Sequence, residues 1–261
     1  LHPRVRRQRQ MCIRDRWSMY DYNRGCCDNI CYSGLADLFR LPKFGLLYFR
    51  TQMKEGTFTP AGPMTYEVFI NSHWLEGSSD TLQVYGNVDE VKLQLNGRVI
   101  ARQYPDDKPS TSEYVSRPDG GNAENIDFPP FTFFNVNWER GELKAIGYKD
   151  GKAVAEHVVR TPGAVEAMDI TYFESGVSAS CRDLLIVYVN LKDLQGTGCF
   201  GENNREVKLE VLQGGELRGP ATIKAEAGVA SFLVATTDSP MLVLKAVSGN
   251  LETMRKLKLK K

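Results

Sequence analysis

Residues 91–103 read VKLQLNGRVIARQ, and this stretch indicates the fold class. Polar and apolar side chains alternate around Asn96-Gly97, a dipeptide that strongly favours a two-residue hairpin turn. Residues 142–159 repeat this arrangement around Lys149-Asp150-Gly151. A period of two places one face of each strand against a core and the other in solvent. The sequence therefore predicts two antiparallel hairpins.

Similar short runs extend from these hairpins in both directions. The first set comprises residues 68–70, 82–85, 91–95, 99–103, 131–136, 142–148 and 153–159. The second set, after the Thr161-Pro162-Gly163 break, comprises residues 168–172, 184–191, 207–212, 222–225, 229–235, 241–247 and 255–259. Short alternating strands with closely spaced turn signals are typical of β-sandwiches. We predict a mainly β protein with two tandem immunoglobulin-like β-sandwiches, at residues 64–161 and 162–261.

The predicted domains do not share a residue period, so they are interpreted as tandem domains and not as internal repeats. Residues 105–130 are rich in Pro, Asp, Ser, Gly and Asn, which predicts a long exposed excursion within the first domain. Residues 55–63, EGTFTPAGP, interrupt every period and are predicted to form a linker.

The segment before this linker, residues 17–54, has a different character. WSMYDYNRG at residues 17–25 predicts a buried strand that enters a loop, and Pro42 can start a predicted helix that runs through residues 46–53. So short a segment cannot bury a core unaided. It either packs on the domain after it or has lost its original neighbours, and we expect the second.

The charge of the chain is unevenly distributed. The 261 residues contain 33 Lys and Arg and 32 Asp and Glu, but residues 1–16 hold six arginines and a single acidic residue, Asp15. This stretch lacks a helical or alternating period, and its MCIRDR run resembles a translated sequencing adapter, so we expect a disordered arm of non-native sequence. The remaining chain is slightly acidic, which gives no general argument for nucleic acid.

Membrane and targeting signals are not evident. The apolar runs are far shorter than the roughly 20 residues that span a bilayer, so we expect no membrane partner. The basic start at residues 1–16 is not succeeded by the apolar stretch of a secretory signal.

Few residues suit catalysis or metal binding. The chain has three histidines. We interpret His157 as a structural imidazole and His73 as a packed side chain. Cys181 and Cys199 flank a predicted strand, so a disulfide between them stays open. The phosphate-loop, dinucleotide-binding and nucleophile-elbow motifs do not occur. We expect neither a metal site nor an organic cofactor.

Two weaker candidates remain for a polar or sugar-binding site. Asp21 comes after the first predicted strand, where a polar site can form, although capping and turn roles explain it and Asp28 equally well. Exposed aromatic side chains on a sandwich face would instead form a platform for sugar rings, and the candidates for it are Trp74, Tyr85, Phe133 and Trp138. Core packing explains most of them better.

These residues carry a family resemblance. WSMYDYNRG and the later YSGLADLFRLPKFGLLYFRTQ resemble the last strand and helix of the (β/α)8 barrel in glycoside hydrolase family 2, the β-galactosidase-like enzymes. The matching positions are Trp17, Tyr20, Asp21, Tyr22, Gly34, Leu35, Asp37, Phe39, Arg40, Pro42, Lys43 and Gln52. Residues 73–103 and 129–163 resemble the immunoglobulin-like domain that comes after the barrel, and residues 217–234 resemble the closing sandwich of the same enzymes.

The resemblance implies a C-terminal fragment of a retaining hydrolase of terminal β-glycosides, chiefly β-galactosides, that acts without a cofactor. The two glutamates of the family's catalytic pair lie on earlier barrel strands, so this chain holds no catalytic residue. Trp17 corresponds to the aromatic that floors the sugar pocket, and Asp21 lies beside it. The implied partners are a carbohydrate, bound through the parent barrel, and the barrel itself, against which residues 17–54 pack.

The resemblance further implies a periplasmic or extracellular location. Two alternatives stay open: a non-catalytic carbohydrate-binding module, or an adhesion-type interaction protein. The second explains residues 17–52 poorly.

Overall fold

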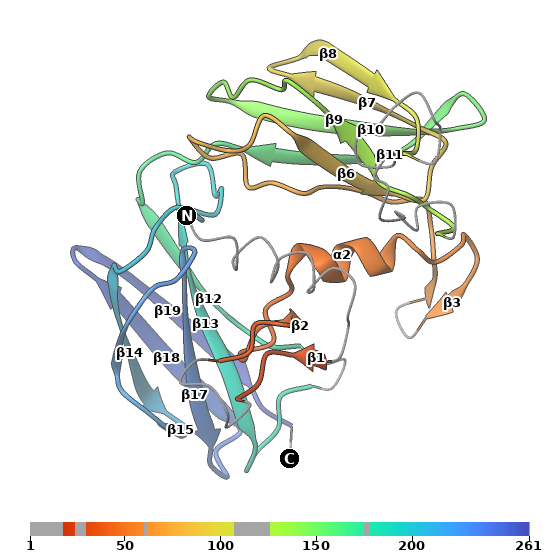
Figure 1. Cartoon of the computed structure of the whole chain (residues 1–261). Coiled ribbons are helices and arrows are strands. Elements are labelled where there is room, and N and C mark those ends of the chain that lie inside the picture. The colour runs from red at the N-terminus through yellow and green to blue at the C-terminus, as the bar shows by residue number, and fades with distance from the viewer. Residues whose placement is uncertain (1–17, 24–29, 60–61, 107–125, 175–177, 261) are drawn as a thin grey trace. The chain divides into compact units, whose positions relative to one another are not determined.

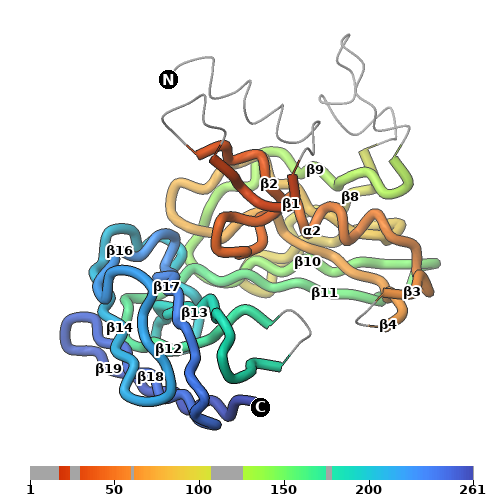
Figure 2. The backbone as a smooth tube through the Cα atoms, turned by 90° about the horizontal axis from the view of Figure 1, so that it is seen from below, coloured from red at the N-terminus to blue at the C-terminus, as the bar shows by residue number. Residues whose placement is uncertain are grey.

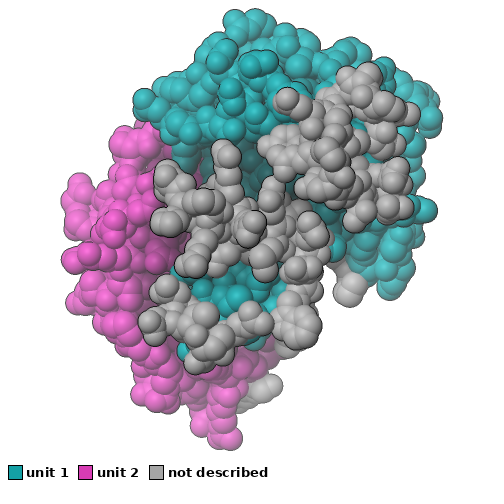
Figure 3. All heavy atoms as spheres, viewed as in Figure 1, with its two compact units in different colours: residues 1–161 teal, residues 162–261 magenta. Residues whose placement is uncertain are grey.

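The computed structural model describes residues 18–23, 30–59, 62–106, 126–174 and 178–260. The predicted arm at residues 1–16 and Trp17 lie outside them. The chain divides into two compact units, Leu1–Thr161 (unit 1) and Pro162–Lys261 (unit 2) (Figure 3). The described residues form several antiparallel sheets and one α-helix, so the prediction of a mainly β protein is confirmed.

Two antiparallel sheets make up most of unit 1 (Figures 1 and 2). The larger has the order β11-β10-β7-β8, and its strands are β7 (Glu90–Leu95), β8 (Arg98–Gln103), β10 (Glu142–Lys149) and β11 (Lys152–Arg160). The smaller has the order β5-β6-β9, and its strands are β5 (Val68–Ile70), β6 (Leu82–Gly86) and β9 (Phe131–Phe133). Each of the seven runs predicted in this region contains an observed strand.

One core lies between these sheets. Alternate residues of β7 and β10 are buried, and they join buried residues of β5, β6 and β9 in a single cluster. Trp74, in the connection after β5, is fully buried in this cluster. This alternation of buried and exposed residues follows from the covering of only one face of the larger sheet.

Both predicted hairpin turns are present. Asn96 and Gly97 connect β7 to β8 with φ values of 50° and 79°. Asp150 and Gly151 connect β10 to β11 with φ values of 48° and 74°. Two successive positive φ values define the type I′ turn, whose twist matches that of the strands it joins.

The N-terminal segment contains a small parallel sheet, α2 and a short hairpin. β1 (Ser18–Tyr20) pairs in parallel with β2 (Gly34–Ala36), which the sequence analysis missed. α2 spans Phe44–Arg50, so it begins two residues after Pro42, the predicted start, and ends three residues before the predicted end at Met53. Beyond the C-cap residue Thr51 the backbone bonds run from residue i to i−3, as in the Gln52 amide to the Phe49 carbonyl. β3 (Phe58–Thr59) and β4 (Gly62–Pro63) form a hairpin inside the predicted linker.

This segment packs on the sheets of unit 1, which is the first of the two alternatives that the sequence left open. α2 contacts both β2 and β6. The Tyr48 and Tyr85 rings meet edge to face with centroids 5.2 Å apart. The Gln52 side chain accepts a hydrogen bond from the Phe128 amide at 3.2 Å and donates to the Phe128 carbonyl at 2.7 Å. The two hydrogen bonds of Gln52 and the ring contact of Tyr48 therefore hold α2 on unit 1, although none of the helix residues is fully buried.

Unit 2 consists of two four-stranded antiparallel sheets that share one core. The first has the order β12-β13-β17-β15, with β12 (Ala167–Tyr172), β13 (Leu184–Lys192), β15 (Gly215–Leu217) and β17 (Val229–Thr236). The second has the order β16-β14-β18-β19, with β14 (Glu206–Gln213), β16 (Thr222–Lys224), β18 (Met241–Ser248) and β19 (Leu251–Lys258). The sequence analysis missed β15 and began β19 four residues late, because both are interrupted by exposed polar residues.

Candidate functional site

Asp21, one of the two predicted site residues, lies at the end of β1 and is buried, with 4% of its surface exposed. Its Oδ1 atom accepts hydrogen bonds from the Gly34 amide at 2.9 Å and from the Lys43 ammonium at 2.6 Å. Its own amide donates to the Ala36 carbonyl at 3.0 Å. The carboxylate therefore fastens the end of β1 to β2 and to the residue that precedes α2.

Lys43 is the N-cap residue of α2, and its side chain extends away from the helix to Asp21. Its ammonium also donates to the Tyr32 carbonyl at 3.3 Å and lies 5.9 Å from the centre of the Tyr32 ring. A charged hydrogen bond with a buried partner is roughly twice as strong as a neutral one. Removal of either partner leaves a charge without its counterion, which costs most for the more deeply buried group, Asp21.

Gly34 permits the close approach of β1 and β2. A Cβ atom at this position would lie 2.3 Å from the Asp21 backbone nitrogen and from the Tyr20 carbonyl carbon. Both are backbone atoms, so the clash cannot be relieved by a rotamer change. The Asp21 site consequently needs glycine at position 34.

Exposed apolar side chains surround this site. β1 was predicted to be buried, but Met19 and Tyr20 are 53% and 38% exposed. In the described residues β1 pairs only with β2, and a paired strand lies beside β1 in the plane of the sheet, so it does not cover the faces of β1. The Arg40 guanidinium lies 5.3 Å from the centre of the Tyr20 ring. Further exposed apolar side chains nearby in the sequence are Tyr32, Leu38 and Phe39. We call these five apolar residues the apolar surface of the N-terminal segment.

The alternative of an exposed aromatic platform does not fit the burial of its candidate residues. Trp74, Tyr85 and Phe133 are buried, and Trp138 is half-buried. The Trp138 indole N–H donates to the Trp74 carbonyl at 3.3 Å. These rings pack in unit 1, which agrees with their interpretation as core residues.

The two described histidines have structural roles. The His157 Nδ1 atom accepts a hydrogen bond from the Ile70 amide at 3.2 Å, and its ring meets Phe69 edge to face. His73 packs against Phe44 with ring centroids 4.8 Å apart. Burial lowers the pKa of both imidazoles, because desolvation disfavours the charged form.

The lowered histidine pKa values predict a pH dependence of stability. The unfolded chain protonates these histidines below about pH 6.5, whereas the folded chain resists protonation. The free energy of unfolding should be greatest above that pH and fall as the pH decreases. We expect His157→Gln to show a smaller decrease between about pH 7 and pH 5 in urea unfolding. Equal slopes for the parent chain and this variant would contradict the assignment.

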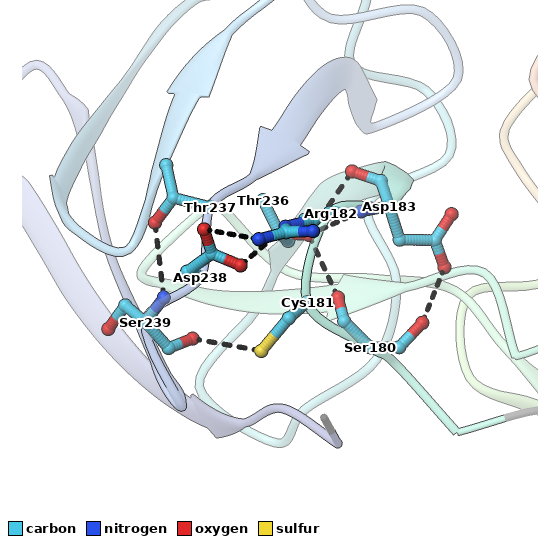
Figure 4. Close-up of polar contacts among 8 residues, drawn as sticks. All are labelled: Ser180, Cys181, Arg182, Asp183, Thr236, Thr237, Asp238 and Ser239. Carbon is cyan, nitrogen blue, oxygen red and sulfur yellow. Dashed lines mark hydrogen bonds and ion pairs between the residues drawn. The ribbon is translucent and has the colours of Figure 1, made fainter.

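The cysteines among the described residues do not form a second site. Cys181 and Cys199 are both free thiols in the structure, so the pairing left open by the sequence is not formed. The Cys181 thiol donates to the Ser239 carbonyl at 3.4 Å, next to the bidentate ion pair of Arg182 with Asp238 (Figure 4). Burial raises the pKa of the Cys199 thiol, which keeps it in its less reactive form.

Metal-binding clusters and membrane-spanning helices are absent from the described part of the chain. It contains no group of three or more His, Cys, Asp or Glu side chains that could hold a metal ion. It also contains no helix with the length and apolar character needed to cross a bilayer.

The Asp21 site itself is a neutral arrangement of one carboxylate and one ammonium, which is suited to holding the neighbouring backbone in position.

Sequence reasoning singled out Asp21 but missed its partners Gly34 and Lys43. Lys43 is 22 positions away from Asp21, and only the return of the chain through β2 brings the two together. The signal in the sequence was the motif of the family resemblance, which contains all three residues without stating that they touch. Trp17, the other predicted site residue, lies outside the described residues.

Comparison with known proteins gives one family model and several relatives. The model, described as a domain of unknown function (DUF4982), matches residues 77–155. A β-galactosidase of Thermoanaerobacter pseudethanolicus is 31% identical over 250 residues, which cover 89% of this chain and 31% of that protein. A β-galactosidase of Thermoanaerobacterium thermosulfurigenes is 24% identical over 78% of this chain and 28% of its own length. The chain thus spans about a third of these relatives.

Solved structures share the fold. A β-glycosidase from Bacteroides vulgatus superposes with a TM-score of 0.71 at 16% identity, over 93% of this chain and 30% of that one. A β-glucuronidase from glycoside hydrolase family 2 superposes with a TM-score of 0.68 at 20% identity, over 88% of this chain and 23% of that one.

Proposed function

This chain is a relative of the glycoside hydrolase family 2 β-galactosidases and β-glucuronidases, and we propose that it is the C-terminal part of a retaining hydrolase of terminal β-glycosides, chiefly β-galactosides. The observation that carries the proposal is the nearly end-to-end alignment of this chain with under a third of a β-galactosidase. The chain's own role is accessory: it completes and supports a catalytic barrel that the parent protein supplies.

The N-terminal segment supports this assignment. Parallel sheets occur almost always with both faces covered by other elements. β1 and β2 are parallel, yet Met19 and Tyr20 of β1 are exposed. We propose that further strands of the parent barrel cover the apolar surface of the N-terminal segment. Trp17 would then floor the sugar pocket, and the ion pair of Asp21 with Lys43 would hold the end of β1 in place.

The sheets of units 1 and 2 support an accessory role. We propose that both are immunoglobulin-like sandwiches. Their described polar side chains lie mainly on outer faces, in scattered pairs of opposite charge such as Arg160 with Glu142 and Lys245 with Glu252. Such exposed pairs contribute little to stability and do not form a convergent catalytic site.

Hydrolysis of chromogenic glycosides tests the proposal. The purified chain is incubated with a β-galactoside and a β-glucuronide, beside the longer protein obtained by extending the reading frame upstream in the source DNA. We expect turnover by the longer protein only, with the β-anomer as the first product seen by proton NMR. In that protein Trp17→Ala should lower kcat/KM at least about tenfold. Turnover by the 261-residue chain, or none by the folded longer protein, would refute the proposal.

A further inference from the structure

A pocket of about 380 Å³ opens on the outward face of the first sheet of unit 2. Its base is formed by Asp169 and Thr171 of β12 and by Asn190 and Lys192 of β13. These four side chains face away from the core, since the intervening residues of both strands belong to the buried cluster. The volume is at the small end of the range of about 300 to 1,000 Å³ that ligand sites occupy.

The base of the pocket is a connected polar network. The Asn190 amide nitrogen donates to Asp169 Oδ1 at 2.8 Å and to Thr171 Oγ1 at 3.0 Å. The Lys192 ammonium donates to Asp169 Oδ2 at 2.7 Å. These bonds fix the orientation of the carboxylate and the amide. Further capacity remains for a ligand, because a carboxylate accepts about four hydrogen bonds and an ammonium donates three.

An aromatic ring and two packed turns form the wall. Phe200 lines the pocket with 37% of its surface exposed, and a Cβ atom at Gly198 would lie 3.0 Å from its ring, so the ring rests on the Gly198 backbone. Gly228 packs so closely that an added Cβ would lie 2.5 Å from the Cys199 carbonyl oxygen. The Leu191 amide donates to the Gly228 carbonyl at 2.8 Å. The wall is therefore held in place by backbone contacts.

The Asp193 carboxylate fixes the loop that leads to Phe200. It accepts hydrogen bonds from the Gln195 amide at 3.0 Å, the Thr197 amide at 2.8 Å and the Gly163 amide at 2.8 Å. Backbone hydrogen bonds lower the pKa of this carboxylate, led by the bond from Gly163. The loop thus keeps its conformation at neutral pH, and the pocket is preformed.

We propose that this pocket binds a neutral saccharide unit. Its two charged lining residues, Asp169 and Lys192, neutralise each other, which disfavours ions. Adjacent hydroxyl groups of a sugar both donate and accept, and they match an oriented carboxylate, amide carbonyl and ammonium. The carbon-bound hydrogens of a sugar ring would pack against the Phe200 face. Binding here requires no turnover elsewhere in the parent protein, so this proposal does not depend on the proposed hydrolysis.

Titration of the 15N-labelled full chain, monitored by NMR, tests this inference. The probes are methyl β-galactoside, methyl β-glucoside and, as an anion, sodium sulfate. We expect saturable shifts of amides at residues 169–171, 190–192 and 198–200 with at least one glycoside, with a dissociation constant of about 1 mM, and not with sulfate.

The variants separate the roles of the polar base and the aromatic wall. Asp169→Asn keeps the shape of the carboxylate, and Phe200→Leu keeps an apolar side chain, so both should fold. Each should weaken glycoside binding at least about tenfold, whereas Phe58→Ala, an exposed aromatic of β3, should leave it unchanged. Absence of saturable shifts, equal shifts with sulfate, or unchanged affinity in both pocket variants would overturn the inference.

Discussion

Replacement of Trp74 by alanine is expected to lower the free energy of unfolding of unit 1 by about 3 to 5 kcal/mol, the range seen when a buried aromatic side chain is truncated. Trp74 has no exposed surface and lies in the core shared by both sheets. Its indole N–H donates to the Glu139 carbonyl at 2.9 Å. The substitution thus creates a cavity and leaves that carbonyl without its indole donor.

The backbone at Trp74 is strained and is held in place by contacts of the same residue. Its φ of 51° is in the left-handed region, which is costly for a bulky residue and persists only where surrounding contacts compensate. The Trp74 carbonyl accepts hydrogen bonds from the Thr161 hydroxyl at 2.9 Å and from the Trp138 indole. Loss of the anchoring indole should release this strained segment as well.

Hydrogen exchange with mass spectrometry and urea unfolding monitored by far-ultraviolet circular dichroism measure this effect. Peptides from residues 64–161 should lose protection in Trp74→Ala, and peptides from residues 162–260 should retain it. Phe58→Ala is the matched control, because Phe58 is 85% exposed and its truncation should change stability by less than about 0.5 kcal/mol. A loss below about 1 kcal/mol for Trp74→Ala would show that the indole is not a principal core contact.

Strands whose local pattern agrees with their environment were predictable from the sequence. β7 and β10 alternate because one face lies on the core, and Asn96-Gly97 and Asp150-Gly151 supply the positive φ values that their turns require. β2 was missed because its three residues, Gly-Leu-Ala, carry no β-branched or aromatic signal. β1 was wrongly predicted to be buried, since apolar composition does not show whether covering elements are present.

Sites that depend on the pairing of distant segments were harder to predict from the sequence. Asp21 stood out only as a polar residue after a strand, and its contact with Lys43 requires the parallel pairing of β1 with β2. The proposed saccharide pocket depends in the same way on the register of β12 and β13, in which Asp169 is opposite Asn190. A strand pattern predicts which face a residue occupies, but the residue opposite it is known only from the register.

Replacement of Asn87 by alanine is expected to cost about 3 kcal/mol, because a single buried side chain satisfies three backbone groups. The Asn87 Oδ1 atom accepts a hydrogen bond from the Glu67 amide at 2.7 Å. Its amide nitrogen donates to the Met53 carbonyl at 3.2 Å and to the Thr65 carbonyl at 3.1 Å. Alanine removes all three bonds from a site where Asn87 is 1% exposed.

The location of these bonds predicts a local consequence in addition to the global loss. Met53 lies shortly after α2, and Glu67 directly precedes β5, so Asn87 holds the N-terminal segment on the sheets of unit 1. In Asn87→Ala the Glu67 amide and peptides from residues 44–59 should exchange faster than in the parent chain. Asn87→Asp should be at least as destabilising, since a carboxylate cannot donate to the two carbonyls and would face them with a negative charge.

Asn137→Ala is the matched control for both Asn87 variants, because Asn137 is an exposed asparagine of the same unit. It should unfold at the same urea concentration as the parent chain. If Asn87→Ala unfolded at the urea concentration of the parent chain, water would be replacing its three hydrogen bonds. The attachment of α2 would then rest on the two hydrogen bonds of Gln52 with Phe128 and on the ring contact of Tyr48 with Tyr85. Faster exchange in residues 44–59 with unchanged global stability would show that the N-terminal segment opens independently of the sheets of unit 1.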